Sequence, residues 1–273
     1  MEKQRHLHIH LGESFADFVH RNPVEREYKK PSGSNIMFYK YRWRLNPPAS
    51  PASVTFHYGH NDIIVHNLIY MRVLEDRRDD SGIGDIYLQA GITPDGWMPH
   101  TEARIQFHAF LQYLLAKGWR YAQGYEAPRL SGAQAMRYKL NEEPYFYLDP
   151  AYLPTRQEWR ALRQGSSATN YWNLHIDNKA FMRIQVGFED HKTDLELGSY
   201  ILFIYLLNGE QQARRYFSPD DEHRMNKRNW QIHWEERLQM ARKTRAEREK
   251  TAIMEGYKID ESYQDYAINP ADY

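Results

Sequence analysis

The stretch YILFIYLL, residues 200–207, decides how the fold is interpreted. Its residues are apolar at even and odd positions alike, whereas a strand with one solvated face alternates apolar with polar residues. The run is far shorter than the about 20 apolar residues that a membrane-spanning helix needs. We therefore predict that residues 198–207 form the central strand of a sheet.

The first half of the chain contains short segments that alternate like half-buried strands, followed by a helical pattern. The predicted strands are IMFYKYRWRL (36–45), VTFHY (54–58), IIVHNLIYMRVL (63–74) and DIYLQAGI (85–92). A helix is predicted over 101–118, with Thr101 as its cap and Gly118 as its stop. Because GHND (59–62) and other short turns join the strands, we expect antiparallel pairing.

The second half contains a similar series of elements. Thr155 and Glu158 form a capping box that predicts a short helix ending at Gly165. The strands YWNLHID (171–177) and AFMRIQVGF (180–188) read as a hairpin. After the central strand, the predicted elements are a turn at Asn208-Gly209, a weak edge strand QARRYF (212–217) and a helix over 219–255. The apolar stripe of that helix is Trp230, Trp234, Leu238 and Ala241.

These elements predict an α+β protein with two lobes. Each lobe is expected to be an antiparallel sheet of about four strands packed with one or two helices, and the second also carries the long C-terminal helix. The expected organisation is an N-terminal extension at 1–34, a first lobe at 35–125, a linker at 126–152 and a second lobe at 153–273.

The composition excludes several classes of function. Lys and Arg total 36, as do Asp and Glu, so the 273-residue chain has no basic excess and no nucleic-acid partner is expected. The absence of cysteine excludes disulfides, thiolate nucleophiles and cysteine-ligated zinc. No apolar run is long enough to span a membrane. The start MEKQRHLHIH lacks the apolar core of a signal peptide, so we expect a periplasmic location if a leader or anchor has been removed and a cytoplasmic one otherwise.

Two groups of histidines are candidates for a metal site. His6, His8 and His10 would share one face of a strand, but a catalytic metal needs ligands from separate elements, so a polar edge strand or a loosely held N-terminus is the favoured interpretation. A second group, His57, His60, Asp62 and His66, surrounds the GHND turn. A metal-dependent hydrolase that uses His57, His60 and His66 is therefore kept as an alternative.

Asp177 and the Asp190-x-Lys192 sequence have the residue types of a restriction-type nuclease site that binds magnesium. Because the strand 180–188 separates the two aspartates, their carboxylates are expected about 30 Å apart, too far to share an ion. Nucleophile-elbow, zincin and phosphate-loop motifs are absent from the sequence. We therefore expect no catalytic residues, no metal and no cofactor.

Several segments resemble immunity proteins of the bacterial type VI secretion system, especially those paired with lipase effectors. The segments that carry this resemblance are GWRYAQGYEAPRLSG (118–132), DPAYLPTRQEWRAL (149–162), the W-x-L-H-x-D hairpin (172–177) and RAEREKTAIMEGYKIDESYQDY (245–266). The resemblance implies a protein that binds a cognate effector toxin and blocks it without chemistry of its own.

Two charged loops leave strands and could enter a cleft of such a toxin. They are EDRRDDSGIGD (75–85) and FEDHKTDLELG (188–198). The predicted toxin contacts on them are Asp79, Asp80, Glu189, Asp190, Asp194 and Glu196. A further alternative is an adaptor protein that docks through the helix 219–255, whose part beyond Arg242 is expected to contribute little to core stability.

Overall fold

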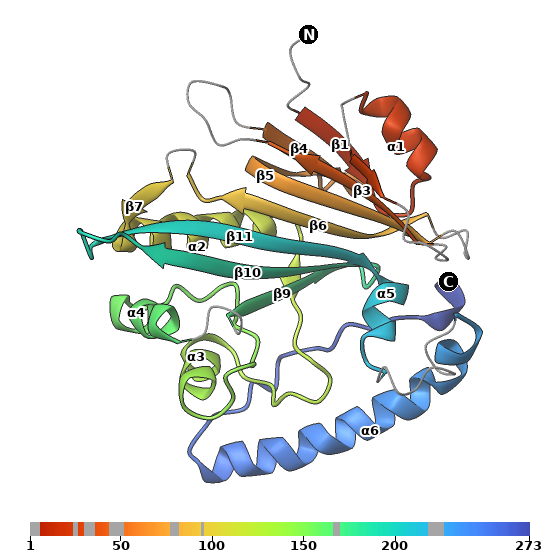
Figure 1. Ribbon diagram of the computed structural model, residues 1–273. Helices are drawn as coiled ribbons and strands as arrows, with labels where there is room; N and C mark the ends of the chain where they lie inside the picture. The colour runs from red at the N-terminus through yellow and green to blue at the C-terminus, as the bar shows by residue number, and fades with distance from the viewer. Residues whose placement is uncertain are drawn as a thin grey trace.

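One continuous sheet forms the frame of the protein (Figure 1). This computed structural model describes residues 6–23, 27–29, 36–43, 52–76, 82–93, 96–165, 170–217 and 227–273. Within these ranges the sheet has eleven strands, and its main path is β1-β4-β5-β6-β11-β10-β9-β8. Off this path, β3 pairs with β5, β2 pairs with β3, and β7 pairs with β11.

The strands are β1 (His6–His10), β2 (Glu27–Lys29), β3 (Ile36–Arg42), β4 (Ala52–His57), β5 (Ile63–Asp76), β6 (Ile83–Gly91), β7 (Trp97–Pro99), β8 (Arg120–Tyr121), β9 (Tyr171–Ile176), β10 (Ala180–Asp190) and β11 (Leu197–Asn208). The helices are α1 (Phe15–Arg21), α2 (His100–Ala116), α3 (Gly132–Asn141), α4 (Arg156–Gln164), α5 (Gly209–Arg214) and α6 (Lys227–Met254), followed by a 3-10 turn at Pro270–Asp272. The α+β class and the long C-terminal helix are as predicted.

The prediction of two separate four-stranded lobes is wrong, because both halves of the chain share the sheet. β6 pairs antiparallel with β11, from Gly91 opposite Ile201 to Asp85 opposite Leu207. An unpaired strand edge leaves backbone N–H and C=O groups without partners, and this pairing satisfies them for both strands. Strands from the two halves therefore border one hydrophobic core.

β11 is the central strand that its sequence predicts. It pairs with β6 on one side and with β10 on the other. The even-numbered residues Leu202, Ile204 and Leu206 are buried. α2 lies behind the central strands in Figure 1 and packs against this side of the sheet through Phe107, whose ring lies 4.6 Å from that of Trp172 on β9. The odd-numbered residues point to the other side.

β1 is an edge strand, as the alternation of HLHIH predicts. It pairs parallel with β4 and buries Leu7 and Ile9 in the common core. The side chain of buried Asn22, which follows α1, accepts a hydrogen bond from the His8 amide at 2.8 Å and donates one to the His8 carbonyl at 2.7 Å. This side chain occupies the backbone groups of His8 in the middle of β1, to which another strand could otherwise pair.

Local signals predicted several helix and turn boundaries correctly. Thr155 and Glu158 form the complete capping box of α4. Asp177 and Asn178 have φ angles of 50° and 59°, the left-handed values that a tight hairpin turn between β9 and β10 requires. Thr101 does not cap α2, because that helix begins one residue earlier at His100 and has Pro99 at its cap position.

The predicted edge strand at 212–217 is wrong. Asn208 does not open a hairpin turn but caps a helix, because its side chain accepts a hydrogen bond from the Gln211 amide at 2.9 Å. The helix α5 follows and buries Ala213 against the end of the sheet. The predicted start of the last helix, 219–226, lies outside the described residues, and the described part of α6 buries all four residues of its predicted stripe.

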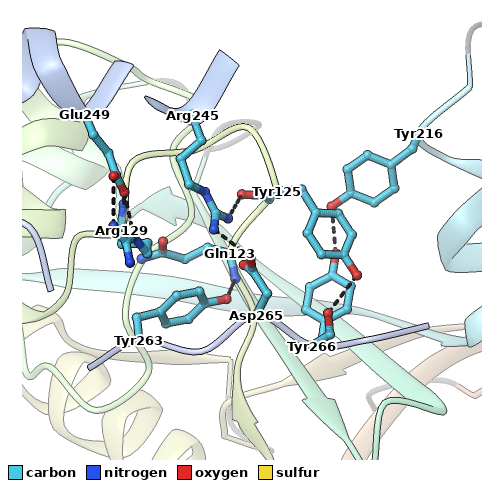
Figure 2. A network of polar contacts seen from close by, with 10 residues as sticks. Gln123, Tyr125, Arg129, Tyr216, Arg245, Glu249, Tyr263, Asp265 and Tyr266 are labelled. Carbon is cyan, nitrogen blue, oxygen red and sulfur yellow. Dashed lines mark hydrogen bonds and ion pairs between the residues drawn. The ribbon is translucent and has the colours of Figure 1, made fainter. Parts of the chain in front are cut away.

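A polar network fastens α6 and the C-terminal segment to the loop after β8 (Figure 2). Arg129 donates from Nε and Nη2 to the two carboxylate oxygens of Glu249, at 2.8 and 3.0 Å. Arg245 donates to Asp265 at 2.7 Å and to the carbonyl of Gly124 at 2.9 Å. The polar half of α6 is thus attached by its charged residues, which pair with groups far away in sequence.

The tyrosines on the other side of this network are buried and joined in series. The hydroxyl of Tyr125 donates to the carbonyl of Tyr266 at 2.8 Å, and the hydroxyls of Tyr216 and Tyr266 lie 2.6 Å apart. Burial raises the pKa of Tyr125 and of Tyr216 far above the ordinary value, so both phenols stay neutral. The chain after α5 is therefore held against the C-terminal segment at Tyr216.

Candidate binding surface

Polar and aromatic side chains form a row across six strands on the side of the sheet opposite α2. Its members are successive cross-strand partners, one on each of β3, β5, β6, β11, β10 and β9: Lys40, Arg72, Tyr87, Tyr205, Arg183 and Asn173. Directly opposite residues have side chains on the same face at about 4.5–5.5 Å spacing. The antiparallel register therefore assembles residues far apart in sequence into one continuous surface.

Side chains along this row contact one another in pairs. The guanidinium of Arg72 lies 5.4 Å from the centre of the Tyr87 ring, and the Tyr87 ring lies 4.7 Å from that of Tyr205. Tyr70 lies two residues before Arg72 on β5, and its ring is 5.9 Å from that of Tyr87. All of these residues are partly exposed. Each of these side chains is therefore partly accessible to a binding partner.

The far end of the row is closed by a segment beside β9. Two hydrogen bonds hold Tyr147 there. Its carbonyl accepts one from the hydroxyl of Tyr121 at 2.6 Å, and the amide of the next residue, Leu148, donates one to the carbonyl of Tyr171 at 2.8 Å. Arg183 lies between the two rings, 5.4 Å from the centre of Tyr147 and 5.2 Å from that of Tyr171. Both aromatic neighbours of this guanidinium are therefore fixed by the backbone.

Arg215 directly follows α5, a helix that packs against β6, β10 and β11, the strands that carry Tyr87, Arg183 and Tyr205. Burial and the neighbouring phenol of Tyr87 raise the pKa of Tyr205, and the charges of Arg72 and Arg215 oppose this rise. We call this surface the Tyr–Arg face, and its residues are Tyr70, Arg72, Tyr87, Tyr147, Tyr171, Arg183, Tyr205 and Arg215.

Gly187 shapes the neighbouring row of side chains. A Cβ atom at this position would lie 2.6 Å from the ring of Phe203, so the absence of a side chain lets the ring rest across β10. Phe203 is the cross-strand partner of Gln89 and Gln185, which flank it on β6 and β10. The Tyr–Arg face thus continues into a flat aromatic position.

The acidic loop predicted to contact a toxin forms the turn between β10 and β11. Glu189, Asp194 and Glu196 are exposed there, and the Asp194 carboxylate accepts a hydrogen bond from the Glu196 amide at 3.1 Å. Glu189 has the same strand parity as Arg183, so it lies at the end of the same sheet face. Asp79 and Asp80, the predicted contacts on the other loop, lie outside the described residues.

Asp190 points to the opposite side of the sheet. It makes a close ion pair with Arg163 of α4 and lies 3.7 Å from Nε2 of His100. Nδ1 of His100 is 2.6 Å from the hydroxyl of Tyr200. Burial and then the charge of Arg163 lower the pKa of His100. This group ties the loop to α2 and α4.

The two groups of histidines considered as metal ligands meet in part at β1 and β4, where the His57 ring lies 5.2 Å from that of His8 and 4.7 Å from that of His10. Nδ1 of His57 bonds Asp62 at 2.7 Å, and its Nε2 lies 2.9 Å from Nδ1 of His8. His66 lies beside the opposite part of β4, between the pairs Val54–Val65 and Ala52–Leu68, about 10 Å along the strand from His57. Within the described ranges, no three His, Asp or Glu side chains are arranged to hold a metal ion.

Comparison with protein-family models, with curated protein sequences and with solved structures finds no match. In the part of the chain that the structure describes, no helix combines the length and the apolar character needed to cross a membrane. The residues of the Tyr–Arg face were not identified as a site from the sequence, although the alternation in DIYLQAGI and AFMRIQVGF places Tyr87 and Arg183 on the less apolar sides of their strands.

Proposed function

We propose that the protein is a non-enzymatic immunity protein that neutralises an antibacterial effector toxin by binding it through the Tyr–Arg face. The observation that carries the proposal is the row from Arg72 through Tyr87 and Tyr205 to Arg183, where rings and guanidinium groups are held partly exposed on four adjacent strands. Tyr and Arg are enriched among the residues that dominate protein–protein binding. The resemblance to type VI immunity proteins indicates the class of partner.

The rigidity of the surface supports a role in tight binding. The strands that carry it are packed from behind by residues such as Leu88 and Ile204, both fully buried or nearly so. A tyrosine has only two side-chain torsions to fix on binding, and here each ring already contacts a neighbour. Little ordering free energy is then lost in the complex, which favours affinity.

The exposed acidic residues of the β10–β11 turn extend this proposed contact. Glu189, Asp194 and Glu196 lie at the end of the sheet and are proposed to contact basic groups at the rim of the partner, where they guide association more than they strengthen it. Asp190 is proposed to act indirectly, because its carboxylate is already engaged by Arg163.

The experiment is to co-express the protein with any toxin encoded beside its gene and to isolate the pair by size-exclusion chromatography. We expect a stable complex, and the double variant Tyr87→Ala/Tyr205→Ala is expected to raise the Kd at least about thirtyfold while keeping the fold.

Two controls test where the partner binds. Ile105→Ala removes an exposed apolar side chain on α2, behind the sheet, and Ile232→Ala removes one on α6. Both variants are expected to bind like the unaltered protein. Loss of binding in Ile232→Ala with normal binding in the tyrosine variant would instead favour the adaptor that docks through its long helix.

A further inference from the structure

Two guanidinium groups on the Tyr–Arg face have no carboxylate partner among the described residues. Arg183 donates from Nε to the amide oxygen of Asn173 at 3.3 Å and from Nη2 to the hydroxyl of Tyr147 at 3.0 Å. Both acceptors are neutral. A guanidinium has five N–H donors, so Arg183 keeps three for another group, including both on Nη1.

Arg215 is the second of these groups. Its backbone amide bonds the carbonyl of Gln212 at 3.3 Å, and the adjacent Tyr216 is anchored to the C-terminal segment, so the chain cannot swing away. Burial, and then the positive charge of Arg183, lower the pKa of Arg215, while the negative charge of Asp85 raises it. Arg215 directly follows α5, which packs against β10, the strand of Arg183, and against β6 and β11. The two positive charges therefore repel one another near the α5 end of these strands.

The nearest acidic residue is already shared with a third arginine. Asp85 lies 3.8 Å from Nη2 of Arg72, its neighbour across β5 and β6. Three guanidinium groups thus face one carboxylate, and three positive charges minus one negative charge leave a net charge of +2. An anion placed between Arg183 and Arg215 would relieve their repulsion and bond the unused donors.

We propose that Arg183 and Arg215 form a carboxylate subsite that binds an Asp or Glu side chain of an acidic segment in the partner protein. The inference rests on the proposed protein-binding function and gives that partner a chemistry. A carboxylate matches the planar fork of a guanidinium, and the rings of Tyr147 and Tyr171 on either side of Arg183 exclude water from the contact. A protein segment is favoured over a nucleic acid because the whole chain has zero formal charge.

The subsite can be tested without the partner. The probe is the capped peptide acetyl-Glu₆-amide, titrated into protein with ¹⁵N-labelled arginine while the side-chain Nε–H signals are followed by NMR. We expect saturable shifts of the Arg183 and Arg215 signals, and an increase in Kd of about tenfold in Arg183→Gln/Arg215→Gln. Arg160→Gln, which removes an exposed arginine from α4, is the matched control and should leave binding unchanged.

Two further probes decide the ligand class. Acetyl-Gln₆-amide has the same length without charge and should not shift these signals. A single-stranded 12-nucleotide DNA should bind more weakly than the Glu peptide at physiological salt. Tighter binding of the DNA with the same dependence on Arg183 and Arg215, or no response to the Glu peptide, would overturn the carboxylate subsite.

Failure of the subsite and failure of the proposed function give different results. If the peptide does not bind but the toxin complex still requires Tyr87 and Tyr205, the face is a protein-binding surface without this carboxylate contact. If the peptide binds at Arg183 and Arg215 but no toxin complex forms, the subsite is retained and the proposed immunity function is overturned.

Discussion

The rings of Tyr87 and Tyr205 lie 4.7 Å apart across the pairing of β6 with β11. The strand pair that carries this contact joins the two halves of the chain. The same contact also lies in the middle of the Tyr–Arg face. A cross-strand aromatic pair contributes roughly 0.2–1 kcal/mol to sheet stability, far less than the burial behind it. Sheet formation thus brings these side chains together, but the stability of the sheet depends little on them. They are therefore available to bind a partner.

Neighbouring residues of β11 should separate stability from binding. Tyr205→Ala removes a ring from the partly exposed face and is expected to reduce the free energy of unfolding by no more than about 1 kcal/mol. Ile204→Ala removes a fully buried side chain on the other face and should cost about 2–5 kcal/mol. Urea unfolding of both variants measures the difference, and equal losses would show that Tyr205 is a core residue.

Stability should fall on acidification because of a buried histidine. His175 stacks on Phe181 and lies 5.5 Å from the ring of Tyr266. Burial, and to a smaller extent the charge of Arg120, lowers its pKa to about 4 from an ordinary 6.5. Because the folded-state pKa is the lower one, the full contribution is present above about pH 6.5 and is lost as the pH falls toward 4.

The linkage predicts a loss of about 2 kcal/mol from His175 alone between pH 7 and pH 5. In His175→Phe, which keeps an aromatic ring beside Phe181 and Tyr266, this part of the pH dependence should disappear. The measurement is the free energy of unfolding in urea at both pH values for the two proteins. A variant with the same pH dependence as the original protein would mean that His175 titrates normally in the fold.

The sequence predicted individual elements better than their assembly. YILFIYLL was correctly placed at the centre of a sheet because a strand buried among neighbours is apolar on both faces. Its pairing with β6 could not be read, since Asp85 and Leu207 lie far apart in sequence and both strands would equally suit a sheet within their own half. The pairing of β6 with β11 is thus the feature that makes the structure a single sheet instead of the two expected lobes.

Other differences have local or long-range causes. The signal for α5 is present, because Asn208 is a favourable helix cap, but Asn-Gly is also a strong hairpin signal, and the sequence alone does not distinguish the two. The anchoring of α6 was not predictable, because Arg129 and Glu249 look like ordinary solvated charges until the chain folds back. Predicting the Tyr–Arg face would need the register of five strand pairs. The alternation within each strand shows which residues share a face, but not which residues lie opposite them on the neighbouring strands.

The edge strand β1 should loosen at acidic pH. Asp62 accepts a hydrogen bond from Nδ1–H of His57, which leaves Nε2 of the neutral ring as the acceptor for Nδ1–H of His8. A positive charge on the His8 ring would lie in a partly buried place beside His6 and His57, whose ring centres are 4.7 and 5.2 Å away. Burial and neighbouring positive charges lower the pKa of His8, and lowered folded-state values mean stability is lost as the pH falls below about 6.5.

Amide hydrogen exchange, corrected for the intrinsic rate, tests this expectation. Protection of the β1 and β4 amides should decrease between pH 7 and pH 5.5 by more than that of the β10–β11 amides, whose decrease reports the global loss of stability expected from His175. His8→Gln retains a polar side chain without the titration and should reduce the difference between the two pH values. Uniform loss of protection across the sheet would assign the effect to global unfolding.

The ion pair of Arg129 with Glu249 should be essential for attaching the second half of α6. The Glu249 carboxylate accepts from the backbone amide as well as the guanidinium of Arg129, and Ala252, one turn further on, is fully buried. Burial raises the pKa of Glu249, but the hydrogen bonds from Arg129 outweigh it and hold the pKa below its ordinary value.

Glu249→Gln turns one acceptor into a donor facing Nη2, so we expect a loss of about 1–3 kcal/mol in the free energy of unfolding. Glu247→Gln, an exposed change two residues earlier on the same helix, is the matched control and should change stability by less than about 0.5 kcal/mol. Equal, small effects in both variants would mean that α6 beyond Arg242 is dispensable, as the sequence alone suggested.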